Sequence, residues 1–126
     1  MAGIIFLKTS DRNAAVEFYR TAMGMTEWVE QPGISILQHE NLLIGFIQTD
    51  GYQHQDDSSL VTFFYRQRSE VDSAYRRLER MAENRPQENA RFRIYNFYAR
   101  DPEGRRFEVQ TFLHDVPPAC ADDRQD

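Results

Sequence analysis

The strongest constraint on the fold of this chain is an apolar helical pattern that occurs twice. The first copy comprises Ala15, Phe18, Tyr19 and Ala22, and the second, 56 residues later, comprises Val71, Ala74, Tyr75 and Leu78. Each copy falls on one face of a helix because its spacing follows the helical period of about 3.6 residues. The first helix is predicted to begin after Ser10-Asp11 and to stop at Gly24, and Ser69 is predicted to cap the second.

Strand patterns flank the two predicted helices in the same order. One predicted strand precedes each helix and three follow it, at residues 4–8, 26–30, 35–39 and 42–48, and again at 60–65, 90–94, 96–100 and 106–112. This internal repeat predicts one module of strand, helix and three strands used twice. We expect a single domain over residues 1–116, with module one at 3–48, a linker at 49–59, module two at 60–113 and a flexible polar tail at 117–126.

An acidic residue interrupts the apolar pattern of the last predicted strand. Residues 101–104 read Asp-Pro-Glu-Gly, a turn sequence in which proline fixes its own φ and Gly104 tolerates a positive one. Side chains of the following strand alternate between its two faces, so Phe107 and Val109 share one face and Glu108 lies on the other. If the two apolar residues pack on a helix, Glu108 looks out of the opposite face of the sheet.

Charge and cysteine content exclude several classes of function. The net charge of −5 argues against a nucleic-acid backbone as the main partner. Cys120 is the only cysteine, so neither an intrachain disulfide nor a cysteine-based metal site is expected. No apolar run has the form of a signal peptide or the length of a membrane span. We therefore expect a cytoplasmic protein that does not engage a membrane.

The repeat and two motifs together resemble a known superfamily. The motifs are Asp11, Phe18-Tyr19 and Met23-Gly24 in the first helix, and the 101–104 turn followed by Phe107-Glu108. With them the chain resembles the glyoxalase/bleomycin-resistance/extradiol-dioxygenase (vicinal oxygen chelate) superfamily over about residues 3–113. The resemblance implies an α+β fold in which two βαβββ modules form an open, curled, mixed, barrel-like sheet around a cavity, with the helices outside. That superfamily contains lyases, isomerases, dioxygenases, antibiotic-modifying enzymes and proteins that only bind a drug, so it does not select a reaction.

The resemblance also implies where a metal would be held in metal-dependent members. Four ligands come from the first and last strands of the two modules, and Glu108 matches the last of them. The other three positions fall at Ile4, at Gly45 and within 60–62, where His, Glu and Gln are absent. We therefore expect neither a metal nor another cofactor. An alternative is an unusual site formed by His39 or His114 with Glu108, although these histidines and His54 also fit ordinary surface positions.

A ligand site without a metal is predicted on the concave face that the resemblance implies. Gly45 would leave room for a ligand, and Trp28 and Tyr98 would line the rim. The predicted ligand-binding residues are Glu108, Arg106, Gln110, Lys8, Gly45, Thr62, Phe64, Trp28 and Tyr98, and no catalytic residue is predicted. In the alternative interpretation, Glu108 forms an internal ion pair with Lys8 or Arg106 and nothing binds there.

Three functional hypotheses follow. The first is a metal-independent small-molecule-binding protein of the glyoxalase/bleomycin-resistance type, rather than an enzyme, whose ligand is cationic or aromatic and binds near Glu108. The second is a lyase, isomerase or dioxygenase with a divalent metal at a non-standard site. The third is a non-catalytic dimerisation module, since members of the superfamily commonly pair and we expect a homodimer.

Overall fold

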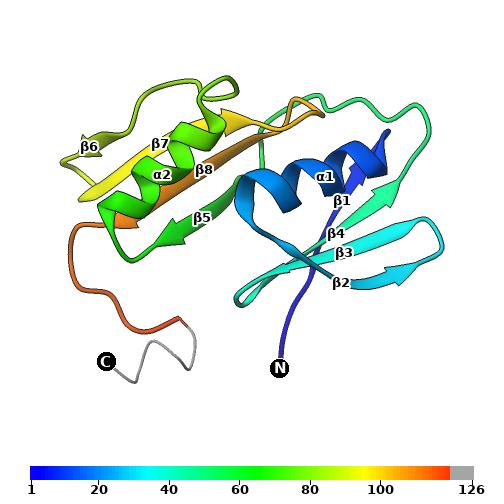
Figure 1. The fold of residues 1–126 in the computed structure, drawn as a ribbon, viewed down its shortest axis with the longest axis horizontal. Helices are drawn as coiled ribbons and strands as arrows, with labels where there is room; N and C mark the ends of the chain where they lie inside the picture. The colour runs from blue at the N-terminus through cyan, green and yellow to red at the C-terminus, as the bar shows by residue number, and fades with distance from the viewer. Residues whose placement is uncertain (120–126) are drawn as a thin grey trace. The chain divides into compact units, whose positions relative to one another are not determined.

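The computed structural model describes residues 1–119 of the chain and consists of two helices and eight strands (Figure 1). The predicted tail lies mostly, and Cys120 wholly, outside the described residues. The first set of elements is β1 (Ile5–Thr9), α1 (Arg12–Met23), β2 (Thr26–Gln31), β3 (Ile34–His39) and β4 (Leu42–Gln48). The second is β5 (Val61–Tyr65), α2 (Arg68–Leu78), β6 (Gln87–Asn89), β7 (Ile94–Arg100) and β8 (Arg106–Phe112).

The two sets build the same mixed sheet twice, which confirms the predicted α+β fold of two βαβββ modules. One sheet has the strand order β1-β4-β3-β2 and the other β5-β8-β7-β6. In each sheet the first strand pairs in parallel with the last, and the remaining neighbours are antiparallel. Neither sheet is closed. The described chain divides into two compact units, one of residues 1–54 with 117–119 and one of residues 55–116, and the boundary after His54 lies inside the predicted linker.

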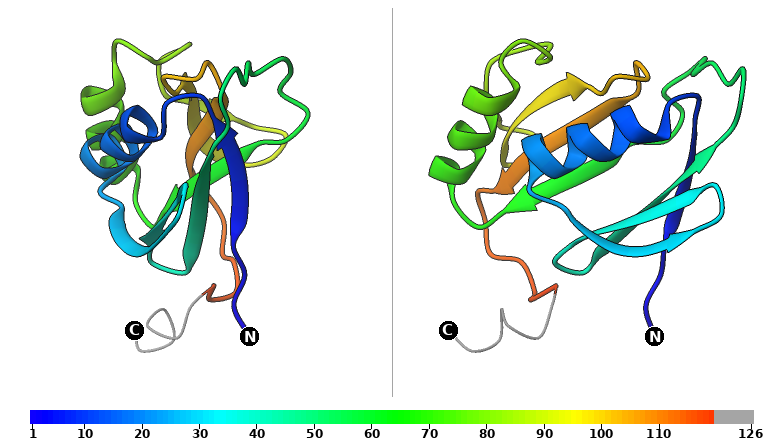
Figure 2. Two further views of the ribbon diagram at one scale, coloured as in Figure 1. Left: turned by 90° about the vertical axis from the view of Figure 1, so that its right-hand side faces the viewer. Right: turned by 45° about the vertical axis from the view of Figure 1, so that its right-hand side comes forward.

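Each helix covers one face of the sheet in its own unit (Figures 1 and 2). In the first unit the ring of Tyr19 stacks on that of Phe46, with centroids 5.2 Å apart. In the second, Tyr75 meets Phe97 edge-on at 5.4 Å. The apolar positions that repeat at 56 residues are buried in these two cores, except for the half-buried Tyr75. The predicted helical faces are thus confirmed, and hydrophobic burial explains why they repeat.

The helix ends agree with the predictions in α1 and differ in α2. Asp11 caps α1 by accepting a hydrogen bond from the Ala14 backbone N–H at 3.0 Å, and Gly24 ends the helix with φ of 67°. The N-cap of α2 is Gln67 rather than Ser69. The carboxylate of Glu70 accepts a hydrogen bond from the Gln67 backbone N–H at 3.1 Å. This capping interaction places the N-cap of α2 two residues before the predicted one.

The strand predicted at residues 90–94 is wrong. Asn89 ends β6 and begins a turn, because its carbonyl accepts the Arg93 N–H at 2.7 Å and its side chain accepts the Phe92 N–H at 3.1 Å. Arg93 has φ of 54°, which removes it from any strand. The residues that follow, Ile94–Arg100, form one continuous strand, β7.

No helix among residues 1–119 is long and apolar enough to cross a membrane.

Candidate functional site

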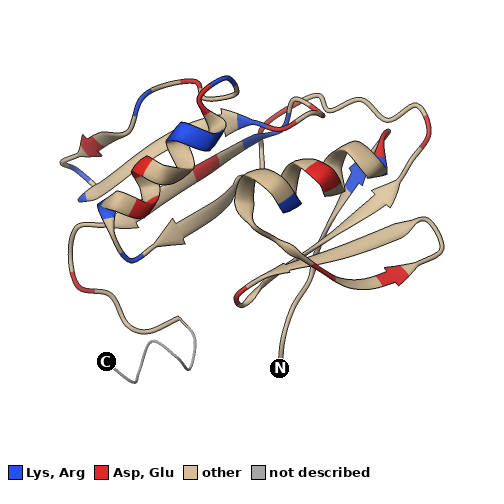
Figure 3. Cartoon of the chain, in the orientation of Figure 1, with Lys and Arg blue, Asp and Glu red and all other residues tan. Residues whose placement is uncertain are grey.

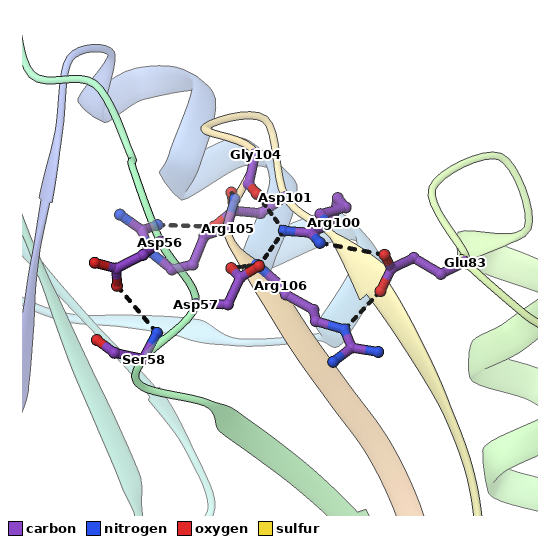
Figure 4. A network of polar contacts seen from close by, with 9 residues as sticks. All are labelled: Asp56, Asp57, Ser58, Glu83, Arg100, Asp101, Gly104, Arg105 and Arg106. Carbon is purple, nitrogen blue, oxygen red and sulfur yellow. Dashed lines mark hydrogen bonds and ion pairs between the residues drawn. The ribbon is translucent and has the colours of Figure 1, made fainter.

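The β7–β8 turn positions the acidic strand and is held by one buried carboxylate. Asp101 accepts the backbone N–H groups of Glu103 at 2.9 Å and Arg105 at 3.0 Å. Its second oxygen accepts the Arg105 guanidinium at 2.8 Å (Figure 4), and both residues are buried. Gly104 closes the turn with φ of 86°. The predicted turn is confirmed, and its aspartate also determines where β8 begins.

Strand β8 alternates as predicted. Phe107 and Val109 are fully buried on the side covered by α2, where Phe107 meets Phe63 at 6.0 Å. Glu108 therefore lies on the opposite face of the sheet, which α2 does not cover. That face is called the open face of the second sheet below because no helix of its own unit covers it, although Asn96, Glu108 and Gln110 on it are buried. It carries Thr62 and Phe64 from β5, Asn96 and Tyr98 from β7, and Arg106, Glu108 and Gln110 from β8.

Glu108 is a buried carboxylate that accepts hydrogen bonds from two neutral side chains. Its residue is 7% exposed. Thr62, its partner across the β5–β8 pairing, donates its hydroxyl to Oε1 at 2.8 Å. Asn96 of β7 donates its amide to Oε2 at 2.7 Å. Asn96 was not among the predicted residues, although its place two residues before Tyr98 assigns it to the same face.

The positive charge nearest along the strand is held away from Glu108. Arg106 donates its Nε–H to Glu83 at 2.6 Å, and its guanidinium lies 3.8 Å from the ring centroid of Tyr98. This hydrogen bond lowers the pKa of the Glu83 carboxyl. Within its own unit, Glu108 forms no salt bridge among the described residues. The alternative of an internal ion pair between Glu108 and Arg106 is therefore wrong.

Glu83 belongs to a network of charges at one end of the second sheet (Figure 4). Arg100 contacts Glu83 at 3.2 Å and Asp57 at 2.7 Å, and it donates a hydrogen bond to the Gly104 carbonyl at 3.0 Å. The bonds to the two carboxylates raise the pKa of Arg100, with the hydrogen bond to Asp57 as the main cause. Charged residues of both signs are interspersed along α2, whereas β5 carries none (Figure 3). Glu83 was not among the predicted site residues. It lies in the loop between α2 and β6, and an acidic residue in a loop follows no periodic pattern from which a role could be predicted.

The remaining predicted residues of the second unit also lie on its open face. Phe64 is 40% exposed and meets Phe112 edge-on at 5.6 Å. Gln110 is buried, and Tyr98 is half-buried beneath the Arg106 guanidinium. The structure thus brings six of the nine predicted residues onto one face: Thr62, Phe64, Tyr98, Arg106, Glu108 and Gln110.

The other three predicted residues lie in the first unit. Lys8 is exposed on β1, and Trp28 is exposed on β2 within a bulge between Glu27 and Val29. Gly45 lies in the centre of β4, but the space beside it is not open. A Cβ atom at this position would lie 2.5 Å from the ring of Phe6, so the room expected for a ligand is filled by an aromatic side chain.

The strand register shows which residues of the two sheets occupy equivalent positions, among them the positions at which the resemblance implies metal ligands. Phe6 faces Gly45 in the first sheet as Thr62 faces Glu108 in the second. By this register Phe6 is the first-strand counterpart of Thr62, and Gly45 is the counterpart of Glu108. These four positions, and Ile4 as well, offer only one carboxylate and one hydroxyl among their side chains. This set does not fit a divalent metal, which needs several oxygen or imidazole donors. No group of three or more His, Cys, Asp or Glu within residues 1–119 could hold one.

Comparison with known proteins identifies the fold. No protein-family model matches the sequence, and no curated protein matches it either. Solved structures do match. A glyoxalase-related enzyme from Fulvimarina pelagi is 19% identical with a TM-score of 0.77, over 97% of this chain and 94% of that one.

Two further solved structures agree with this match. A glyoxalase/bleomycin resistance protein/dioxygenase family enzyme from Burkholderia phytofirmans is 19% identical with a TM-score of 0.76, over 87% of this chain and 97% of that one. A lactoylglutathione lyase from Agrobacterium tumefaciens is 21% identical with a TM-score of 0.70, over 88% and 92%. At such identities the likeness concerns the fold. The chain therefore has the glyoxalase/bleomycin resistance protein/dioxygenase fold that its repeat and its two motifs predicted.

Proposed function

We propose that this protein binds a small molecule without a metal, on the open face of the second sheet beside Glu108. The observation that carries the proposal is the environment of this carboxylate. It is buried, its two protein partners are neutral, and the residues at the equivalent place in the first sheet are Phe6 and Gly45. A metal-binding member of the fold would need donors where this chain has a phenyl ring and a glycine.

The hydrogen bonding of Glu108 supports a role in recognition. A carboxylate has about four acceptor positions, and Thr62 and Asn96 use two of them. The two donors also orient the group, because each holds a different oxygen. A ligand N–H or O–H can therefore meet an acceptor whose position is already determined, which reduces the entropy lost on binding.

The side chains around Glu108 supply the apolar contacts that a small ligand needs. Phe64 exposes 40% of its surface and Tyr98 is half-buried, both on the same face as the carboxylate. Small-molecule sites in proteins combine such apolar and aromatic walls with a few oriented polar groups. In this proposal Glu108 and Gln110 orient the ligand, and Phe64 and Tyr98 contact its apolar body.

A thermal-shift screen in the presence of EDTA tests the proposal. The library should contain amines, neutral aromatics and antibiotic-like compounds. We expect one chemical class to raise the melting temperature, because a ligand at 100 times its Kd stabilises the folded state by about 2.7 kcal/mol. Backbone amide shifts should then place the hit on β5, β7 and β8. The absence of any stabilising class, or hits whose shifts lie only on α2, would contradict the proposal.

Elemental analysis separates this proposal from the metal-dependent alternative. Protein purified without chelator is expected to contain no stoichiometric Mn, Fe, Ni or Zn. A stoichiometric metal that is lost in Glu108→Ala and kept in Glu79→Ala would instead favour a lyase, isomerase or dioxygenase. Glu79 is the matched control because it is an exposed acid at the end of α2.

A further inference from the structure

We propose that the ligand presents a primary ammonium group to Glu108, and that Glu83 keeps this carboxylate available by holding Arg106 on Tyr98. The inference rests on the proposed function, since it names the ligand class of that same site. It assigns a role to the charge network at the end of the second sheet, which the proposed function does not use (Figure 4).

The first step concerns charge. Glu108 is 7% exposed and receives hydrogen bonds from a hydroxyl and an amide, neither of which carries charge. A buried carboxylate is costly unless a positive charge accompanies it. Because no salt bridge within its own unit reaches Glu108, a cationic ligand gains more here than a neutral ligand of the same shape.

The second step concerns Arg106, which could cancel this charge. Arg106 and Glu108 are two residues apart on the same face of β8, a separation of about 7 Å that an arginine side chain spans. Arg106 is instead held by Glu83 at 2.6 Å and lies over Tyr98 at 3.8 Å. Arg100 contacts the other oxygen of Glu83 at 3.2 Å and so fixes the carboxylate that holds Arg106.

The third step concerns the size of the cationic group. Because only 7% of Glu108 is exposed, we take the group that reaches its carboxylate to be a compact one. A primary ammonium is compact and has three N–H donors, whereas a quaternary ammonium is larger and has none. Phe64, 40% exposed beside Thr62 on β5, offers an aromatic surface for the body of the ligand. A primary amine on a flat apolar scaffold combines both features.

Three matched compounds test the ligand class on the unmodified protein. Benzylamine, benzyl alcohol and benzyltrimethylammonium share one ring and differ in the group that would meet Glu108. In titrations followed by backbone amide shifts, we expect benzylamine to bind on β5, β7 and β8 at least about tenfold more tightly than the other two. Benzyl alcohol binding on the same strands as tightly as benzylamine would overturn the ammonium assignment and leave the proposed function standing.

Four variants test the roles of the two carboxylates. Glu108→Gln should weaken benzylamine binding at least about tenfold. Glu83→Ala should weaken it about fivefold, the effect expected if Arg106 then occupies Glu108 about four-fifths of the time. The double variant Glu83→Ala/Arg106→Ala should regain the lost affinity, since no arginine is left to compete. Glu79→Ala, which removes one exposed acid at the end of α2, should bind as the wild type does.

Distinct results overturn distinct parts of the inference. Unchanged benzylamine affinity in Glu83→Ala, or a double variant as weak as Glu83→Ala, would overturn the role of Glu83. If Glu108→Gln does not fold, the comparison of the three compounds on the wild type still decides the ligand class. If none of the three compounds shifts the amides of β5, β7 or β8, both the ammonium assignment and the binding face fail.

Discussion

In the first sheet, Gly45 of β4 faces Phe6 of β1, whereas at the equivalent place in the second sheet Glu108 of β8 faces Thr62 of β5. One pair is an aromatic ring lying against a glycine, and the other is a buried carboxylate held by a hydroxyl. The faces covered by the helices do not differ in this way, because both are packed with aromatic and aliphatic side chains. The two modules therefore agree on the face that each helix covers and differ, at this position, on the opposite face.

The largest expected loss of stability comes from introducing, at Gly45 of the first sheet, the glutamate that the second sheet carries at position 108. Gly45→Glu should lower the free energy of unfolding by at least about 3 kcal/mol, because the new side chain must push aside the Phe6 ring, which is 47% exposed, and brings a charge next to Ile36. Urea denaturation measures the loss. Adding Phe6→Thr should recover at least about 1 kcal/mol by recreating the Thr62–Glu108 arrangement. A double variant no more stable than Gly45→Glu would show that the two positions are not equivalent.

The second comparison concerns the turns that precede the last strand of each sheet. Asp101→Ala should destabilise the protein by about 3 kcal/mol, since Arg105 and two backbone N–H groups lose a buried acceptor. In the other turn, Glu40 is exposed, and Glu40→Ala should change stability by less than about 0.5 kcal/mol. Similar losses in the two variants would contradict the view that only the second turn depends on a buried acid.

The third comparison concerns the donors of Glu108. Thr62→Val keeps the shape of the side chain but removes the hydroxyl at 2.8 Å from the carboxylate. We expect a loss of about 1.5–2 kcal/mol, the usual contribution of a hydrogen bond to a charged group. Thr26→Val, on the exposed strand β2, serves as the control and should be nearly neutral. An equally neutral Thr62→Val would mean that Glu108 does not depend on this donor.

The smallest expected effect concerns the pH dependence contributed by Glu83. Its lowered pKa means that the folded state favours the charged carboxylate, so its contribution is complete above the ordinary pKa of glutamate. The contribution falls as the pH drops below that value and disappears below the lowered pKa of the folded state. Because the side chain is 34% exposed, Glu83→Ala should cost less than about 1 kcal/mol at pH 7.

Denaturation of wild type and Glu83→Ala at a series of pH values checks this window. The two stability curves should converge in acid. A difference that grows as the pH falls would contradict the assigned sign of the pKa shift.

Local patterns explain why much of the fold was predictable. The helical stripes, the Asp11 cap, the Gly24 stop and the 101–104 turn act through neighbours along the chain, and all four are present in the structure. The errors arose where a nearby side chain offered a competing hydrogen bond. Glu70 placed the N-cap of α2 at Gln67 rather than Ser69, and Asn89 turned the chain where residues 90–94 were predicted to extend.

The site was predictable only in part, because its contacts join strands that are distant in the sequence. Alternation along β8 placed Glu108 on the correct face, but its donors come from β5 and β7. Arg106 illustrates the limit. Its sequence position two residues before Glu108 suggested an ion pair, whereas Glu83, 23 residues earlier, takes the guanidinium.

The sequence by itself determined the repeated module and the face of β8 on which Glu108 lies, because periodicity and residue type decide both. Only the tertiary structure decided what surrounds these residues. Strand register brought Thr62 to Glu108 and Phe6 to Gly45, and chain folding brought Glu83 to Arg106. The physical reason is that hydrogen bonds and ion pairs act over a few ångströms in space, whatever the separation along the chain.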